Sequence, residues 1–252
     1  MSRFEIHLVQ WTPEKISRFW AYLTSTPTAE GSYFSGLFGE RILALTARYI
    51  PSSTKKIVDY GCGPGFLVEQ LLRSGLPAEG LEFSNDSAQS ARNRCQSYPA
   101  FGGVTHIREL PSPIQTGTVD VLFLVEVIEH LVSAQRDATL REIQRLLSVG
   151  GIFIVTTPHR EDLRRVSTVC PDCGCVFHPW QHVDSFDARS LALLLSQYGF
   201  EQVACMPTNL GARWYGRALR AVRKFFLGDR ALQNEPHLIY VGRRTEKMMV
   251  TR

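Results

Sequence analysis

A short apolar segment that runs directly into a glycine-rich turn constrains the fold of this chain more than any other feature. Lys56–Tyr60 is predicted to form a buried strand, Gly61–Gly65 a tight loop, and Phe66–Ser74 a helix. Glycines at positions 61, 63 and 65 remove side chains where a backbone can approach a ligand, and the first turn of a helix leaves N–H groups unpaired. These segments predict a strand–loop–helix unit with a ligand at its junction.

The same alternation of strand and helix continues along the chain. Continuous apolar strands separated by helices indicate an α/β fold with a doubly wound, mostly parallel seven-stranded sheet. We predict helix caps at Ser84 and Asp187. In such sheets, ligands bind outside the carboxyl ends of the strands. The predicted strands are residues 56–60, 78–83, 104–108, 119–125, 152–156, 201–206 and 236–241.

The chain divides into two parts, and two segments interrupt the second. Residues 1–50 are predicted to form a helical lead-in that closes as a lid over the ligand edge, and residues 51–252 the α/β domain. Residues 158–186 form a Cys/His-rich loop, and residues 207–235 a basic helical insertion. We expect substrate contacts from these two segments, because loops gather at the ligand edge of the sheet.

The composition is that of an ordinary globular protein. The 252 residues are 44% hydrophobic and 21% charged, which excludes collagen-like, low-complexity and wholly disordered classes. No apolar stretch approaches the roughly 20 residues that cross a bilayer. The N-terminus lacks the apolar core of a signal peptide. We therefore expect a cytoplasmic protein.

The net charge of +4 is concentrated in one segment. Arg213–Arg230 holds six basic residues and one acidic residue, with apolar side chains on the opposite face of the predicted helix. Three interpretations stay open. The helix can pack on the domain as a lid, dock on an anionic membrane surface and make the protein peripheral, or hold an anionic substrate.

Two acids beside the glycine loop indicate the ligand. Asp59 immediately precedes the loop, and Glu82 ends the second predicted strand, where an acid can bind both ribose hydroxyls. The dinucleotide pattern G-x-G-x-x-G is not met, because Phe66 stands where its third glycine belongs. A carboxylate at Asp59 would repel a pyrophosphate, but it suits the ammonium and sulfonium groups of S-adenosylmethionine. The loop therefore favours S-adenosylmethionine over NAD.

Three segments together resemble the successive motifs of class I S-adenosylmethionine-dependent methyltransferases, of the type 11/12 kind that includes ubiquinone-biosynthesis O-methyltransferases. They are Val58-Asp-Tyr-Gly-Cys-Gly-Pro-Gly65, Gly80-Leu-Glu-Phe-Ser84 and Val125-Glu-Val-Ile-Glu-His-Leu131, and the resemblance covers about residues 55 to 205. It implies a Rossmann-like methyltransferase fold and a bound S-adenosylmethionine. The residues it implies for cofactor binding are Asp59, Gly61, Gly63 and Gly65 at the methionine end, Glu82 at the ribose, and Glu126.

The acids and histidine after the fourth strand are the catalytic candidates. Methyl transfer depends mainly on alignment, and an O-methylating enzyme adds a base or a metal for the acceptor hydroxyl. Glu129 and His130 are predicted to supply this chemistry beside Glu126. The same E-x-x-E-H run resembles the metal-binding pattern of small-RNA 3′-end 2′-O-methyltransferases, in which case His182 is the downstream histidine.

Three functions therefore stay open. The first is O-methylation of a small-molecule, lipid-linked or glycan-like acceptor. The second is metal-dependent 2′-O-methylation of an RNA 3′ end, although nucleic acid is not the expected partner, because the chain has no evident RNA-binding module. The third is binding of S-adenosylmethionine without catalysis.

The cysteine cluster in residues 158–186 predicts a structural zinc ion. Cys170, Cys173, His178 and His182 follow the spacing C-x2-C-x4-H-x3-H, which suits tetrahedral zinc, and Cys175 is an alternative ligand. The competing interpretation is a reduced cluster without metal, in which His178 or His182 contacts substrate or cofactor. The two metal interpretations compete for His182.

Overall fold

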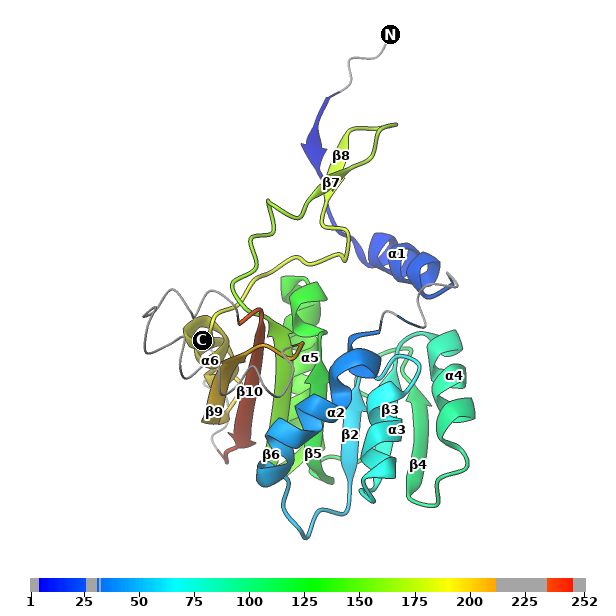
Figure 1. The fold of residues 1–252 in the computed structure, drawn as a ribbon, viewed down its shortest axis with the longest axis vertical. Coiled ribbons are helices and arrows are strands. Elements are labelled where there is room, and N and C mark those ends of the chain that lie inside the picture. The colour runs from blue at the N-terminus through cyan, green and yellow to red at the C-terminus, as the bar shows by residue number, and fades with distance from the viewer. Residues whose placement is uncertain (1–4, 26–30, 32, 212–234, 247–252) are drawn as a thin grey trace.

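Seven strands form a central sheet in the order β4-β3-β2-β5-β6-β10-β9 (Figure 1). The computed structural model describes residues 5–25, 31, 33–211 and 235–246. Neighbouring strands are parallel except at β10, which is antiparallel to both β6 and β9. The doubly wound, mostly parallel sheet is confirmed. Its strands are β2 (Ile57–Tyr60), β3 (Ala78–Glu82), β4 (Phe101–His106), β5 (Val119–Val125), β6 (Leu147–Pro158), β9 (Phe200–Thr208) and β10 (His237–Arg244).

Two helices begin at side-chain caps predicted from the sequence, and the helix after the glycine loop ends before a glycine. Ser84 accepts a hydrogen bond from the Ser87 amide, and Asp187 forms a capping box with Ser190, so both predicted caps are confirmed. Gly75 follows the helix that starts after the glycine loop. The helices are α1 (Pro13–Ser25), α2 (Phe34–Thr46), α3 (Phe66–Arg73), α4 (Asn85–Cys95), α5 (Ser133–Leu146) and α6 (Ala188–Ser196), with short 3₁₀ turns at Ala47–Tyr49 and Ile128–His130.

Alternate strand residues enter two hydrophobic cores, one on each face of the sheet. Val58 and Leu122 pack in the core that includes buried residues of α5 and α6. Their neighbours Ile57 and Val121 pack in the core shared with α2, α3 and α4. Successive side chains of a strand point to opposite faces, so a strand buried on both faces is apolar throughout. This explains why the strands were readable as continuous apolar runs.

Two strands begin three or more residues earlier than predicted. β4 begins at Phe101 and contains Gly102 and Gly103, whose weak strand preference hides the start of the strand in the sequence. β6 begins at Leu147, directly after α5, and its pairing with β5 jumps from Leu147 to Ile152. Gly150 takes a φ of 81° inside this irregular stretch. A bulge of this kind leaves no alternating pattern from which the strand start can be predicted.

A second, three-stranded sheet forms between the Cys/His-rich loop and the N-terminal segment. β7 (Thr168–Val169) and β8 (Cys175–Phe177) form an antiparallel hairpin in the Cys/His-rich loop. β1 (His7–Leu8) adds to β8 as a parallel strand, so the N-terminal segment is tied to this loop. Figure 1 shows this small sheet projecting beyond the main sheet, with α1 beside it. Strand pairing between the N-terminus and this loop was not predicted.

The basic segment Arg213–Arg230 lies outside the described residues, so its three interpretations stay predictions. Within the part of the chain that the structure describes, no helix has the length and apolar character needed to span a bilayer.

Gly65→Ala is expected to lower the free energy of unfolding more than the matched control Gly75→Ala. Both glycines have positive φ values, 83° and 76°, where a side chain costs about 1–2 kcal/mol. A Cβ at Gly65 would lie 2.8 Å from the Ala91 Cβ, whereas one at Gly75 would meet no atom within 4 Å. Overpacking adds about 1–3 kcal/mol in Gly65→Ala alone. Urea unfolding of both variants measures this, and equal losses would contradict it.

Candidate active site

The glycine loop lies at the carboxyl ends of β2 and β3. Its backbone adopts left-handed conformations, which glycine favours. Gly61, Gly63 and Gly65 all have positive φ values, of 75°, 52° and 83°. The Gly61 and Cys62 amides both donate to the Leu81 carbonyl, at 2.8 and 3.0 Å. A Cβ on Gly61 would lie 3.0 Å from a methyl group of Val127, so the loop packs closely under the turn that follows β5. The predicted strand–loop–helix unit is therefore confirmed.

Glu82 fixes the loop to the end of β3. One carboxylate oxygen accepts the Gly63 amide at 2.8 Å, and the other accepts the amides of Phe83 and Ser84, both at 2.8 Å. Burial raises the pKa of Glu82, and these three N–H groups oppose the shift. An ionised carboxylate has about four acceptor positions, so Glu82 retains capacity for a ribose hydroxyl.

Asp59 is buried in β2, with 2% of its surface exposed. Burial raises the pKa of Asp59 to about 8, and the charge of Glu82 adds to the shift. Asp59 therefore holds a proton at neutral pH until a cationic group approaches, because a nearby positive charge favours the ionised carboxylate. Asp59, the glycine loop and Glu82 thus lie together at one edge of the sheet, and their role in cofactor binding stays a prediction.

Glu126 is held in an unusual backbone conformation just after β5. Its φ is 51°, its amide donates to the Thr156 carbonyl at 3.1 Å, and the Thr156 hydroxyl donates to its carboxylate at 2.7 Å. Burial raises the pKa of Glu126 to about 7 against the hydrogen bond from Thr156. A non-glycine residue at positive φ stores strain of a kind that gathers at functional sites.

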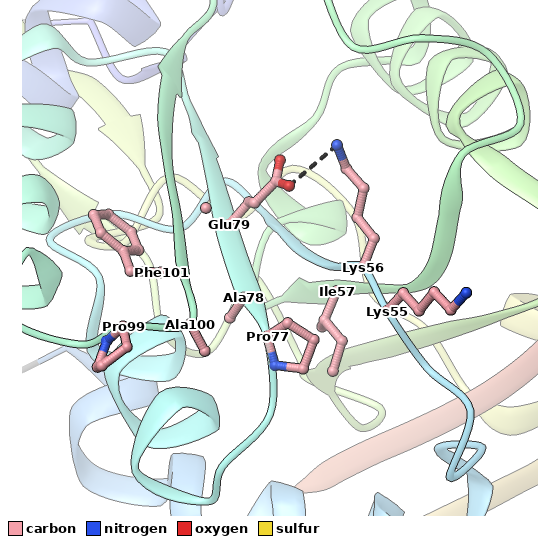
Figure 2. A pocket seen from close by; sticks show the side chains of 10 residues that line it. Lys55, Lys56, Ile57, Pro77, Ala78, Glu79, Pro99, Ala100 and Phe101 are labelled. Atoms are coloured by element: carbon pink, nitrogen blue, oxygen red, sulfur yellow. Dashed lines mark ion pairs between the residues drawn. The ribbon is translucent and has the colours of Figure 1, made fainter.

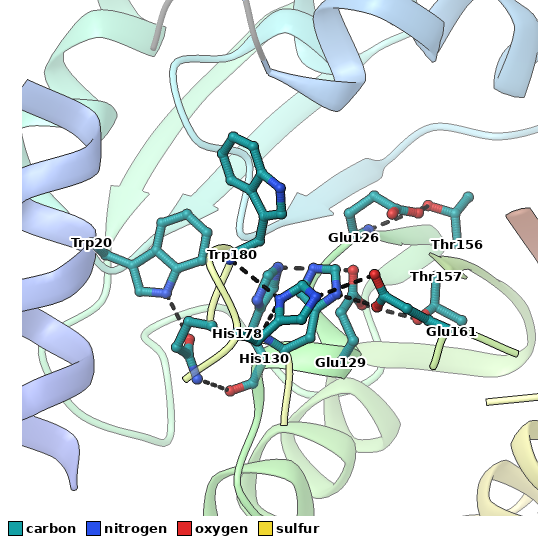
Figure 3. Close-up of polar contacts among 11 residues, drawn as sticks. Trp20, Glu126, Glu129, His130, Thr156, Thr157, Glu161, His178 and Trp180 are labelled. Carbon is teal, nitrogen blue, oxygen red and sulfur yellow. Dashed lines mark hydrogen bonds and ion pairs between the residues drawn. The ribbon is translucent and has the colours of Figure 1, made fainter. Parts of the chain in front are cut away.

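Glu129 and His130 lie on the 3₁₀ turn after Glu126, facing the Cys/His-rich loop (Figure 3). Glu129 is 1% exposed; one of its oxygens accepts the Thr157 hydroxyl at 3.1 Å, and the other has no hydrogen-bond partner. Burial and the charge of Glu126 raise the pKa of Glu129. Burial and the neighbouring His182 lower the pKa of His130 to about 3, so this imidazole is neutral.

Glu161 contacts both His178 and His182, and it was not among the residues predicted from the sequence. Its two oxygens contact the His178 Nε2 at 3.3 Å and the His182 Nδ1. Against the opposing effect of burial, the contacts with His182 and His178 hold the pKa of Glu161 below its ordinary value. The available signal was an acid three residues beyond the end of β6, at the ligand edge of the sheet.

The hydrogen bonds define the roles of the two imidazoles. His178 Nδ1 accepts the amides of Trp180 and His182 at 3.2 and 3.3 Å, so its proton lies on Nε2, toward Glu161. His182 directs Nδ1 at the Glu161 carboxylate, which makes Nδ1 the donor and Nε2 the acceptor. The two rings stack with centroids 4.3 Å apart. His182 thus presents a lone pair, whereas His178 orients Glu161.

Two groups of residues have ligand atoms within 4.8 Å of one another, counting only described residues. One is Glu129, His130 and His182; the other is Glu161, His178 and His182. Neither contains a cysteine. The structure therefore brings His178 and His182 together with Glu161 instead of with Cys170 and Cys173, and zinc on the predicted set stays a prediction.

The N-terminal lead-in contacts this site through Trp20. The Trp20 indole, on α1, donates to the Gln181 side chain at 2.9 Å, and the Gln181 amide donates to the His130 carbonyl at 2.9 Å (Figure 3). The Val183 amide donates to the Glu129 carbonyl at 2.8 Å. The lead-in, the Cys/His-rich loop and the turn after β5 are therefore one hydrogen-bonded unit.

A separate pocket lies at the opposite, amino-terminal ends of β2, β3 and β4 (Figure 2). Lys56 and Glu79 form an ion pair of 3.1 Å in its wall, and Phe101 lines another side. Ligands of doubly wound sheets bind at the carboxyl ends, so this pocket is not the cofactor site.

Comparison with known proteins identifies the family. Residues 33–204 match the family model described as a methyltransferase domain, so the chain belongs to this family. Its motifs and its relatives put it among the class I S-adenosylmethionine-dependent methyltransferases.

Two curated relatives and one solved structure illustrate the similarity. The ubiquinone biosynthesis O-methyltransferase of Pectobacterium carotovorum is 30% identical over 107 residues, 42% of this chain and 44% of that protein. The malonyl-(acyl-carrier protein) O-methyltransferase of Legionella pneumophila is 25% identical over 142 residues, 56% of this chain and 49% of that protein. The chain thus spans about half the length of these relatives.

The solved structure shows the shared fold. It is the 1,6-didemethyltoxoflavin-N1-methyltransferase of Burkholderia thailandensis, with 1,6-didemethyltoxoflavin and S-adenosylhomocysteine bound. The comparison of this structure with the present one gives a TM-score of 0.66 at 13% sequence identity. The match covers 96% of this chain and 94% of that chain.

Asp59→Asn is expected to make the ligand-free protein more stable than wild type at pH 9, with little difference near pH 4. The pKa of Asp59 is about 8 in the folded protein, against an ordinary 3.8, so the wild-type fold loses stability as pH rises between these values. The same variant loses the anionic partner for the ammonium group and binds S-adenosylmethionine more weakly. Thermal unfolding from pH 4 to 9 measures the first effect, and a difference independent of pH would contradict it.

Glu82→Gln is expected to weaken S-adenosylhomocysteine binding by about 10- to 100-fold, because hydrogen bonds to a charged group contribute about 1.5–3 kcal/mol. Glu79→Gln is the matched control: Glu79 lies on the same strand but pairs with Lys56 away from the glycine loop. Isothermal titration calorimetry compares the two. Equal affinities would show that Glu82 does not bind the ribose.

Proposed function

We propose that this protein transfers a methyl group from S-adenosylmethionine to a hydroxyl oxygen of a small-molecule, lipid-linked or glycan-like acceptor. The observation that carries the proposal is the pairing of His182 with Glu161 beside the carboxyl end of β5, where Glu126, Glu129 and His130 also lie. The two curated relatives described above are named as O-methyltransferases, which supports oxygen as the accepting atom.

The proposed reaction needs alignment and one proton acceptor. The acceptor oxygen attacks the methyl carbon, the bond between that carbon and sulfur breaks, and neutral S-adenosylhomocysteine leaves. The hydroxyl proton passes to His182 Nε2, and the Glu161 carboxylate balances the imidazolium that forms, as in other carboxylate–histidine pairs. Asp59, the glycine loop, Glu82 and Glu126 hold the cofactor in line.

The electrostatics favour His182 over the two residues predicted from the sequence. His130 is a weak base, because burial and His182 lower its pKa to about 3. Burial raises the pKa of Glu129, which favours its protonated form over the carboxylate that a base requires. In the proposal, Glu129 and His130 therefore line and position the reacting groups, and His182 accepts the proton.

A second candidate is metal-dependent 2′-O-methylation of an RNA 3′ end. The ligand atoms of Glu129, His130 and His182 lie within 4.8 Å of one another, and an oxygen of Glu129 and the Nδ1 of His130 are buried without hydrogen-bond partners. These residues fit a divalent cation, which would supply charge to hold and acidify the ribose hydroxyl. Methylation of an RNA 3′ end that requires added divalent cation would select this candidate.

We also propose that the protein acts in the cytoplasm. Its basic segment, Arg213–Arg230, binds an anionic membrane surface or an anionic part of the acceptor. The competing proposal is a cofactor-binding protein without catalysis. Product formation over a panel of hydroxylated metabolites, with labelled S-adenosylmethionine, distinguishes the two.

Glu161→Gln is expected to lower kcat for a substrate found in this panel by about 100-fold or more, because the His182 imidazolium loses the charge that balances it. This is the lower range of the effects of general bases on rate, and cofactor affinity is expected to stay unchanged. The matched control is Asp162→Asn, because Asp162 is the neighbouring acid and is exposed. Initial rates and calorimetry measure both quantities. A Glu161→Gln enzyme with the kcat of Asp162→Asn would contradict the role proposed for the pair.

A further inference from the structure

The small sheet formed by β1, β7 and β8 lacks a core of its own. Its strands have two or three residues each, and Ile6, Leu8 and Val169 are 69%, 78% and 45% exposed. An isolated hairpin is at best marginally stable in water, and small structures without sufficient core need a cross-link or a metal. This small sheet therefore needs a further source of stability.

The hairpin that joins β7 to β8 carries three cysteines, Cys170, Cys173 and Cys175, within six residues. The Cys170 amide donates to the Cys175 carbonyl at 2.8 Å. Gly174, at a φ of 78°, donates its amide to the Cys170 carbonyl at 2.9 Å and closes the turn. Two cysteines in the spacing C-x2-C on a tight turn are typical of structural zinc sites.

The N-terminal strand brings a histidine to the same hairpin. His7 is the register partner of Cys175 in the parallel pairing of β1 with β8, so the two side chains lie on one face of the small sheet. The His7 Nδ1 lies 3.1 Å from the Glu5 carbonyl, which makes Nδ1 the donor and leaves Nε2 as the acceptor. Metal-bound histidines commonly have this arrangement, with the second ring nitrogen donating to a carbonyl.

We propose that Cys170, Cys173, Cys175 and His7 bind one structural zinc ion through three thiolates and one imidazole. This set revises the ligands predicted from the sequence, because His178 and His182 are engaged with Glu161. Three thiolates and one imidazole form a common tetrahedral set for structural zinc. Metal binding has to draw the sulfurs together, since the described groups with ligand atoms within 4.8 Å contain no cysteine.

The proposed zinc would have a definite structural consequence. It would cross-link the N-terminal segment to the Cys/His-rich loop, two segments far apart in the sequence. α1 follows β1 directly and carries Trp20, which hydrogen-bonds Gln181 over the candidate active site. The ion would therefore hold the lead-in in the position that covers His130, without touching the reacting groups.

The test is metal analysis and zinc-edge X-ray absorption of the full-length protein purified without added zinc. We expect one zinc per chain, with three sulfurs at about 2.3 Å and one nitrogen at about 2.0–2.1 Å. Cys175→Ser and His7→Asn are expected to bind zinc more weakly, by 10-fold or more in a chelator competition. Cys205→Ser, which lies on β9 away from the hairpin, and His182→Asn are expected to retain the zinc.

Three results would overturn the proposal. They are a shell of two sulfurs and two nitrogens that is lost in His182→Asn, absence of stoichiometric zinc, and a Cys170–Cys173 disulfide in the purified protein. The absorption measurement uses wild-type protein, so it decides the ligand set even if a variant does not fold. Because zinc content is measured without substrate, its outcome is independent of the proposed methyl transfer.

Discussion

The buried carboxylate of Glu82 is the interaction on which the rest of the site depends. By accepting three backbone N–H groups, it fixes the glycine loop to the end of β3 and sets the distance between two neighbouring strand ends. Its charge also helps to keep Asp59 protonated until a cation arrives. Three of the five loop residues are glycines, which have no side chains to fix the loop. A hydrogen-bond acceptor in a fixed position must therefore define the path of its backbone. The cofactor edge is therefore an arrangement of buried acids around flexible backbone.

The other half of the site repeats this principle with acids and imidazoles. Burial raises the pKa values of Glu126 and Glu129, and the charge of Glu161 is offset by His178 and His182. Buried ionisable groups reduce stability unless a partner compensates them, and they gather where a protein handles charge or protons. The hydrogen bonds of Gln181 and Val183 hold the Cys/His-rich loop against the turn after β5, beside this cluster. This concentration of buried ionisable groups therefore marks the region as the candidate site of the chemistry.

Local patterns predicted most of the fold, and they placed several of the candidate site residues at one edge of the sheet. The strands were readable because both of their faces are buried, and the caps at Ser84 and Asp187 depend on neighbouring residues only. The contact of Trp20 with Gln181 joins residues 161 positions apart, and the pairing of β1 with β8 is equally remote. No local periodicity encodes such contacts. Glu161 was missed for the same reason, since only the folded loop brings it to two histidines.

A crystal structure with S-adenosylhomocysteine bound would show whether the cofactor lies between the glycine loop and His182, because it locates the cofactor and the proposed reacting groups together. We predict that the ribose hydroxyls bind Glu82, that the amino group lies beside Asp59, and that the sulfur faces the space between Glu126 and His182. A cofactor whose sulfur points away from that space, or whose ribose does not contact Glu82, would contradict the account.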